Sequence, residues 1–351
     1  LGLGEHQGGQ QNDLGIRVIS GGQSAQDFLC LGCGVGGAHH GSCCFSQHVC
    51  HIWTCGSCWC LLSHNSTLTN TVRNLDLELQ GTFWAHLGVL MEYTGKTTLI
   101  TGASSGIGVH FAEGFAARGS NLILVARRKE LLADLAAKLT KNCGVTVDVI
   151  TEDLSVPGSG AALEKKVSKK HTVDVLVNNA GFGTNNLFVN EDRSRIAQEI
   201  QLNVGTLVDL TAAFLPAMVE RNSGVVVNIA STASFQPVPG MAVYGATKAF
   251  VRSFTEAVWG ELRGTNVRVL AVNPGATESE FFLVAGGKSP GKPMPAIAVV
   301  EAMFAALDAS SSTPSVVVGG VNKMSSSLVK FFPKKTVIKL VGTMFMPKEG
   351  K

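Results

Sequence analysis

The sequence predicts an α/β protein with a doubly wound parallel sheet, and three observations support this prediction. Short apolar runs alternate with segments of helical periodicity between about residues 91 and 320, as in proteins with parallel sheets. A glycine-rich turn follows the first of these runs, at residues 101–108. The chain has 351 residues with 45% hydrophobic content, which is enough to form a full-sized core.

The composition divides the chain at about residues 88–93. Eight of the nine cysteines and seven of the nine histidines precede residue 91, and residues 28–72 contain no Lys, Arg, Asp or Glu. We expect residues 1–90 to be an unstructured or artefactual extension, because they show little periodic apolar pattern. The alternative is a metal or redox module, since Cys30-x-x-Cys33 and Cys55-x-x-Cys58 have the spacing of a zinc knuckle.

Charge and hydropathy exclude several classes of function. The net charge of +3 is too small to favour nucleic acid, and no basic run lies among aromatic residues. No uninterrupted apolar run reaches about 18 residues, so we expect no membrane span. The first residues lack the basic-then-apolar order of a secretion signal, and we therefore expect a cytoplasmic enzyme.

The first expected strand, 97–100, leads into a glycine motif and then into a helical pattern through Phe111 and Phe115. In this context a glycine turn binds a dinucleotide, because the backbone can approach closely and the pyrophosphate meets free amides at the helix N-terminus. The spacing is Gly-x-x-x-Gly-x-Gly, and an ordinary turn is the alternative. The candidate cofactor residues here are Gly102, Ser104, Ser105, Gly106, Ile107 and Gly108.

The end of the second expected strand, 121–125, indicates which dinucleotide is bound. Many NAD sites place an acid at this point, which binds the ribose 2′-hydroxyl and would repel a 2′-phosphate. Here Ala126 is followed by Arg127 and Arg128, whose planar guanidinium groups suit a phosphate. We therefore expect NADP(H). The alternative is that both arginines are simply solvated at the start of the next helix, 129–141.

The rest of the domain continues the alternation. Expected strands are 145–151, 173–177, 225–229, 267–272 and 315–318, and expected helices are 160–170, 191–221, 241–263 and 298–307. Residues 286–295 are rich in Gly, Pro and Lys, which predicts a mobile loop. Asn203 is a polar residue inside the apolar pattern of the helix 191–221.

Tyr244 and Lys248 lie four positions apart in the expected helix 241–263, so they share one helix face. A phenol titrates near pH 10, and an ammonium group beside it favours the phenolate. Such a tyrosine can act as a general acid/base in carbonyl–alcohol interconversion. Many surface helices carry Tyr-x-x-x-Lys by chance, so the pair alone is a weak signal.

In their order along the chain, these residues resemble the short-chain dehydrogenase/reductase family over about residues 92–320. The resemblance rests on the glycine motif at 101–108, Asp153, Asn178-Asn179-Ala180-Gly181, Asn203, Ser231, Tyr244-x-x-x-Lys248 and Pro274-Gly275. Ser231 precedes Tyr244 by 13 positions, which is the usual separation in this family. The resemblance implies one Rossmann-type domain at 91–320, followed by a C-terminal extension at 321–351.

The resemblance also implies a role for each residue. Tyr244 would be the general acid/base, and Lys248 would lower its pKa and bind the nicotinamide ribose. Ser231 would stabilise the developing alkoxide, with Ser234 as a nearby alternative. Asn203 would hold a water that links Lys248 to solvent, or else be a satisfied helix amide. Further expected cofactor contacts are Asp153 and Leu154 near the adenine, and Asn179, Ala180, Gly181, Pro274, Gly275 and Thr277 near the nicotinamide.

Together these features predict an NADP(H)-dependent oxidoreductase that interconverts a ketone or aldehyde and the matching alcohol, with no metal in the enzyme domain. A ketoacyl or keto-lipid substrate is a narrower hypothesis, based on the tail and on an apolar loop at 281–285. Two other functions remain. One is a regulator that binds NADP(H) without turnover, and the other is a metal-binding interaction protein that uses the N-terminal cysteines.

The tail, residues 327–351, mixes apolar residues with lysines. We expect it to pack back onto its own domain, and contact with a membrane surface is the alternative. The family resemblance implies a homodimer or homotetramer that pairs the helices 191–221 and 242–263.

Overall fold

The computed structural model describes residues 16–20, 27–31, 53–55, 58–62 and 93–346, and the chain divides into the units Leu1–Thr82 and Phe83–Lys351. The described part of the first unit is an antiparallel sheet with the order β1-β2-β4-β3. Its strands are β1 Ile16–Ser20, β2 Asp27–Leu31, β3 Trp53–Cys55 and β4 Cys58–Leu62. We did not expect strands here. Cys55 and Cys58 are paired residues of β3 and β4, whereas Cys33 lies outside the described residues.

The second unit is built on seven parallel strands in the order β11-β10-β9-β8-β5-β6-β7. The strands are β5 Thr97–Thr101, β6 Asn121–Ala126, β7 Val147–Thr151, β8 Val175–Asn178, β9 Gly224–Ile229, β10 Val267–Asn273 and β11 Ser315–Val317. The chain order reverses between β5 and β8. In open α/β sheets such a reversal opens a crevice at the carboxyl ends of the strands, where ligands bind.

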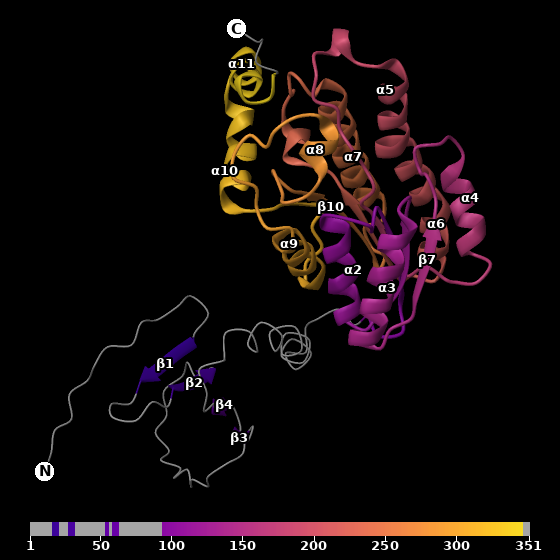
Figure 1. Ribbon diagram of the computed structural model, residues 1–351, viewed down its shortest axis with the longest axis vertical. Coiled ribbons are helices and arrows are strands. Elements are labelled where there is room, and N and C mark those ends of the chain that lie inside the picture. The colour runs from indigo at the N-terminus through magenta and orange to yellow at the C-terminus, as the bar shows by residue number, and fades with distance from the viewer. Residues whose placement is uncertain (1–15, 21–26, 32–52, 56–57, 63–92, 347–351) are drawn as a thin grey trace, which may run out of the picture. The chain divides into compact units, whose positions relative to one another are not determined.

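Helices cover both faces of this sheet, which confirms the predicted doubly wound fold (Figure 1). One face carries α2 Ile107–Ala117, α3 Lys129–Cys143 and α9 Ile297–Asp308. The other carries α4 Ser159–Val167, α6 Leu207–Glu220 and α7 Ala242–Glu261. Successive strand residues point to opposite faces, so Ile100 belongs to the core beneath α2 and Leu99 to the core beneath α6.

The expected helix 191–221 is divided into three parts. These are α5 Arg193–Ile200, a π-helical turn η2 Gln201–Thr206, and α6. Single π-turns inside α-helices are uncommon and often mark functional sites. Within the described residues, Arg193–Glu220 is the one helical run long and apolar enough to span a membrane, with a mean hydropathy of 1.5. Leu210, Phe214 and Met218 pack against the sheet, as expected for a core helix.

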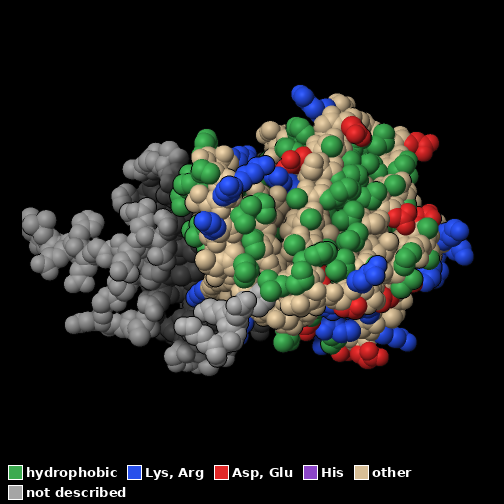
Figure 2. All heavy atoms as spheres, turned by 90° about the horizontal axis from the view of Figure 1, so that it is seen from above, with side chains coloured by type: hydrophobic (Ala, Val, Ile, Leu, Met, Phe, Trp, Pro, Cys, Tyr) green, Lys and Arg blue, Asp and Glu red, His purple; other side chains and the backbone are tan. Residues whose placement is uncertain are grey.

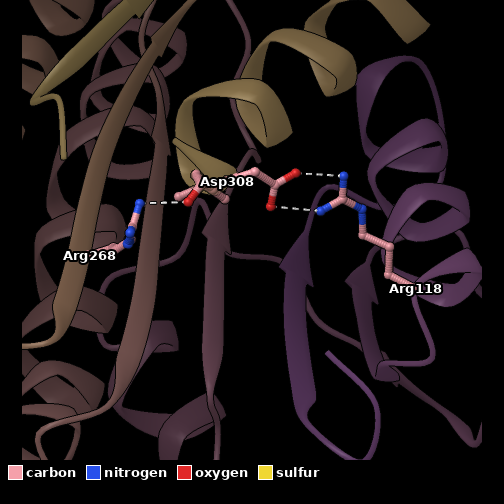
Figure 3. A network of polar contacts seen from close by, with 4 residues as sticks. Arg118, Arg268 and Asp308 are labelled. Carbon is pink, nitrogen blue, oxygen red and sulfur yellow. Dashed lines mark hydrogen bonds and ion pairs between the residues drawn. The ribbon is translucent and has the colours of Figure 1, made fainter. Parts of the chain in front are cut away.

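An ion pair joins the end of α9 to the end of α2 (Figure 3). The two terminal guanidinium nitrogens of Arg118, just after α2, donate to the carboxylate of Asp308 at 3.0 and 2.9 Å. Arg268 of β10 donates to the carbonyl oxygens of Leu307 at 2.6 Å and Ala309 at 2.9 Å. The end of α9 is therefore held by two arginines from elements far apart in the sequence.

The C-terminal extension folds onto its own domain, as we expected. It contains α10 Gly320–Leu328, a 3₁₀ turn η4 Val329–Phe331 and α11 Lys334–Phe345. Val337 and Val341, one turn apart on α11, are buried in a cluster with Val238 and Met241. The apolar segment 281–285, expected as a loop, is instead a short helix, α8 Phe281–Ala285. It ends at Gly286, whose φ of 76° is left-handed, a common way for helices to stop.

Candidate active site

The sequence-predicted site residues converge on one edge of the sheet, the carboxyl ends of its parallel strands. The glycine motif follows β5, Arg127 and Arg128 follow β6, Asp153 follows β7, Asn179 follows β8, Ser231 follows β9 and Pro274 follows β10. Tyr244 and Lys248 come from α7, which packs against β9 and β10. Parallel strands place these loops side by side, so residues up to about 170 positions apart can share one crevice.

The glycine turn has no room for side chains at three positions, Gly102, Gly106 and Gly108. A Cβ atom on Gly108 would lie 2.2 Å from the Gly102 carbonyl oxygen, and one on Gly102 would lie 2.9 Å from the Ala180 Cα. Gly106 is the N-cap of α2 and makes no side-chain cap, and the first turn of α2 carries no acidic residue. Free amides at an uncapped helix N-terminus attract anions. The turn therefore fits a pyrophosphate.

Asn179 holds this turn in place from the neighbouring strand. Its side-chain nitrogen donates to the carbonyl oxygens of Thr101 at 2.9 Å and Gly102 at 3.2 Å. The Thr101 hydroxyl in turn accepts from the amides of Asn179 and Ala180, both at 3.0 Å. The side chain of Asn179, expected near the nicotinamide, is thus already engaged with the glycine turn.

The two arginines after β6 are both exposed. Arg128 pairs with Glu280 at 2.9 Å and its Nε lies 3.3 Å from the Ser104 hydroxyl, so it is next to the glycine turn. Asp153 is exposed and its carboxylate accepts from the Ser155 amide and hydroxyl. Burial raises its pKa, but these two hydrogen bonds lower it more, so the net pKa is below its usual value. Leu154 beside it is buried.

Ser231 and Tyr244 form the first half of the candidate catalytic group. Ser231 precedes the 3₁₀ turn η3 Thr232–Phe235, and its hydroxyl accepts from the Ala233 amide at 3.1 Å. Burial raises the pKa of Tyr244 to about 12, while a hydrogen bond with the Ser231 hydroxyl acts in the opposite direction. Ser234, the alternative to Ser231, instead bonds Asn273 at 3.2 Å. Ser231 is therefore the serine of the two that is hydrogen-bonded to Tyr244.

Lys248 is buried, and its ammonium donates to the Ile229 carbonyl oxygen at 2.6 Å. Burial lowers its pKa to about 8, and the carboxyl of Glu199 opposes that shift. The Nζ atom is 5.9 Å from the centroid of the Tyr244 ring. Burial of the phenol raises the pKa of Tyr244, and the expected lowering of that pKa by Lys248 stays a prediction.

Asn203 joins two segments of the site. Its side-chain nitrogen donates to the Phe182 carbonyl at 2.8 Å and to the Thr247 hydroxyl at 3.1 Å, and its oxygen accepts from the Phe182 amide at 3.1 Å. Both donors are therefore used within the protein, as in the satisfied-amide alternative. A Cβ on Gly181 would lie 2.9 Å from the Asn203 oxygen and 3.5 Å from Lys248 Nζ, so Gly181 lies between them.

The segment after β10 is the last of those that lie at the carboxyl ends of the strands. The Pro274 carbonyl accepts from the Thr232 amide at 2.9 Å and lies 3.5 Å from the Ser231 hydroxyl. Thr277 donates from its hydroxyl to the Gly275 carbonyl at 3.0 Å, and a backbone bridge joins it to Met294. The predicted loop 286–295 is therefore tied back to the site at its end.

Glu199 is a site residue that we did not predict. It is buried, and its carboxylate accepts from the Thr184 hydroxyl at 2.8 Å. Its charge also contributes to the pKa of both Tyr244 and Lys248. The available signal was a charged residue one helical turn before Asn203, on the same face.

An apolar wall lies beside Tyr244. The Tyr244 and Phe281 ring centroids are 4.9 Å apart, and Gly183 lies against both rings. These rings join the cluster of Val238, Met241, Ala285, Val337 and Val341. The tail helix α11 and the short helix α8 thus supply the apolar side of the crevice.

Known proteins are similar to this chain in sequence and in fold. The family model for short chain dehydrogenases matches residues 96–284. Sulfoacetaldehyde reductase 2 of Chromohalobacter salexigens is 39% identical over 201 residues, covering 54% of this chain and 75% of the relative. The ketoacyl reductase HetN of Nostoc is 35% identical over 182 residues, covering 52% and 63%.

Among solved structures, a short-chain dehydrogenase from Sphingobium yanoikuyae in complex with NADPH superposes with a TM-score of 0.59 at 35% identity. The match covers 68% of this chain and 96% of that one. The family model covers more than half of the chain, and the superposition shows that the fold is shared. The chain is therefore an oxidoreductase of the short-chain dehydrogenase family.

Proposed function

We propose that this chain is an NADP(H)-dependent oxidoreductase that interconverts a ketone or aldehyde and the matching alcohol. The proposal rests on the proximity of Ser231, Tyr244 and the buried Lys248 in the crevice that also contains the glycine turn. The bound cofactor would supply the hydride, or accept it in the reverse direction. The glycine turn and the start of α2 would hold its pyrophosphate, and Arg127 and Arg128 a 2′-phosphate.

The chain's own residues would manage the proton. In the direction of reduction, the Ser231 hydroxyl donates to the carbonyl oxygen and stabilises the negative charge that develops there. Tyr244, whose raised pKa keeps it protonated at neutral pH, donates its proton to that oxygen. Lys248 places a buried cation nearby, which favours the phenolate that results.

The apolar wall beside Tyr244 is consistent with an apolar substrate, such as a ketoacyl chain or another bulky ketone. Phe281, Met241 and Val238 belong to this wall, and apolar side chains cannot satisfy a charged group taken from water. Of the two named relatives, the ketoacyl reductase acts on the substrate type that fits this wall better.

The test is NADPH oxidation by the full chain across ketones, aldehydes and ketoacyl thioesters, with Tyr244→Phe as the control. We expect turnover with apolar ketones and a loss of at least about 100-fold in kcat for Tyr244→Phe, the order of magnitude for a general acid. Tight NADPH binding with no turnover on any substrate would favour the non-catalytic regulator instead.

A second arm tests the cofactor. Replacing Arg127 and Arg128 with Ala should weaken NADPH binding by at least about tenfold while NADH binding changes little, because only NADPH carries the 2′-phosphate. Equal losses for both cofactors would contradict the proposed preference. Because this arm measures binding, it stays informative even if the physiological substrate is absent from the panel.

A further inference from the structure

The end of η4 and the residue that follows it present two phenylalanines to solvent. Phe331 is 83% exposed and Phe332 is 56% exposed. Both follow α10 and precede Pro333, the N-cap of α11, so the turn projects from the junction of two helices. Other apolar side chains on α10 and α11, including Met324 and Leu340, are also exposed. Several exposed apolar side chains on one short stretch of chain point to a site of interaction.

Lysines surround these phenylalanines. Lys330 precedes the pair, and Lys334 and Lys335 follow it, while Lys323 and Lys339 lie on the flanking helices. There is no Asp or Glu from residue 309 to residue 346. None of these five lysines forms an ion pair with a described residue. Figure 2 shows Lys and Arg side chains interspersed with hydrophobic ones on the face of the domain that it views.

The buried side of the tail is already occupied. Val337 and Val341 of α11 pack against Val238 and Met241, and the Phe345 carbonyl accepts from the Asn185 side chain at 2.8 Å. These contacts hold α11 on the domain without using Phe331 or Phe332. The exposed phenylalanines are therefore not required for docking of the tail, and α10 and α11 lie along one outer side of the domain (Figure 1).

We propose that the turn 330–335 docks this protein on an anionic phospholipid surface, with Phe331 and Phe332 inserted among the lipids and the lysines against the headgroups. Aromatic side chains settle at the boundary between headgroups and acyl chains. Each lysine near an anionic bilayer strengthens binding on the order of fivefold. The charge favours lipid over a second copy of the chain, because the copy would bring the same lysines to the contact.

Docking in this way has a consequence for the proposed reaction. The helix that follows the turn, α11, also forms part of the apolar wall beside Tyr244. A lipid-soluble carbonyl compound would therefore meet the protein on the side where its site is apolar. This consequence rests on the proposed reductase function, whereas docking itself does not.

The test is flotation of the full chain with vesicles of phosphatidylcholine alone or mixed with phosphatidylserine. We expect the chain to float with the mixed vesicles and not with the neutral ones, and high salt to release it. Phe331→Ser with Phe332→Ser should reduce binding by at least about tenfold. Lys330, Lys334 and Lys335 changed to Gln should reduce it by on the order of 100-fold, three steps of about fivefold.

Two matched controls distinguish binding through this turn from nonspecific adsorption to the vesicles. Lys165, Lys169 and Lys170 on and after α4 are exposed, and changing these three to Gln should leave flotation unchanged. Val189, which is distant in sequence from Phe331 and Phe332, is 86% exposed. Val189→Ser should likewise leave flotation unchanged. NADPH binding by each variant shows that it is folded.

Flotation that is absent in the parent, or equally lost in the control variants, would overturn the proposal. A change in oligomeric mass on substitution of Phe331 and Phe332, without vesicle binding by the parent, would show that a second copy covers this turn. Because flotation needs no substrate, a failure here leaves the proposed reductase activity intact, and a failure of turnover leaves docking intact.

Discussion

Glu199 shows how one buried carboxyl is tuned by its neighbours. It has no exposed surface, and one of its oxygens has no hydrogen-bond partner among the described residues. Burial raises its pKa to about 7, the Thr184 hydrogen bond opposes this, and the charge of Glu191 adds to it. The cations that face it, Arg195 and Lys248, lower the pKa but do not restore the ordinary value of 4.5.

The raised pKa of Glu199 predicts a dependence of stability on pH. Since the folded pKa lies above the unfolded one, the native state keeps a proton that the unfolded chain has lost, so this residue's contribution to stability falls from about pH 4.5 to about pH 7. Glu199→Gln keeps an acceptor for Thr184 and removes the charge. We expect it to exceed the parent in unfolding free energy by on the order of 2–3 kcal/mol at pH 8, and by little at pH 5.

Urea denaturation at both pH values measures this difference. The matched control is Glu130→Gln, at an exposed position in the first turn of α3, which should show no such dependence on pH. A Glu199→Gln advantage of the same size at pH 5 and pH 8 would mean that the ionised carboxyl is not what destabilises the fold.

At the scale of elements, α9 is held by the ion pair of Arg118 and Asp308. The two side chains are only 21% and 12% exposed, and the Arg118 guanidinium also lies 3.7 Å from the centroid of the Phe304 ring. Phe304 in turn meets Tyr93 and Phe115 edge-on. The pair therefore holds the end of α9 against the end of α2, beside this aromatic cluster.

We expect Asp308→Ala to lower the unfolding free energy by about 2–4 kcal/mol, because it leaves a largely buried guanidinium without its bidentate partner. The control is Lys138→Ala, which removes an ion pair with Glu113 from a lysine that is 57% exposed. That change should cost less than about 1 kcal/mol. Comparable losses for both variants in chemical denaturation would show that the burial of the Arg118 pair adds nothing.

The elements themselves were largely predictable from sequence. The strand 121–125 and the helix 129–141 match β6 and α3 within two residues at each end, because periodic burial leaves a clear pattern over such lengths. The helix α8 was missed because five residues are too few to show periodicity. The π-turn at Gln201–Thr206 was missed because one extra residue per turn hardly disturbs an apolar stripe.

At the scale of the whole molecule, α5 and α7 carry an open apolar hollow of about 570 Å³. Phe188, Ile200, Val204 and Phe250 are among the residues that line it, and Ser231 and Tyr244 do not. It lies on the outer side of the helices that we expected to pair between subunits. We propose that a second copy of the chain covers this hollow, as the family resemblance implies.

Phe250→Lys should therefore shift the protein to a smaller species in light scattering, because a charge placed in a dry apolar contact is costly. Leu131→Lys, at an exposed apolar position on α3, should leave the mass unchanged. A parent protein that is already a monomer at high concentration would contradict the proposal, and a mass unaffected by Phe250→Lys would exclude this face.

The sequence alone was enough to predict the parallel sheet and the glycine turn, because local periodicity and short motifs encode them. The Ser231–Tyr244–Lys248 set came from the family resemblance. Three features emerged only in the folded chain. Glu199 reaches the site, α11 forms a wall beside Tyr244, and the pKa of Tyr244 rises to about 12. Each depends on residues brought together from distant elements and on their burial, neither of which is a property of any short stretch of sequence.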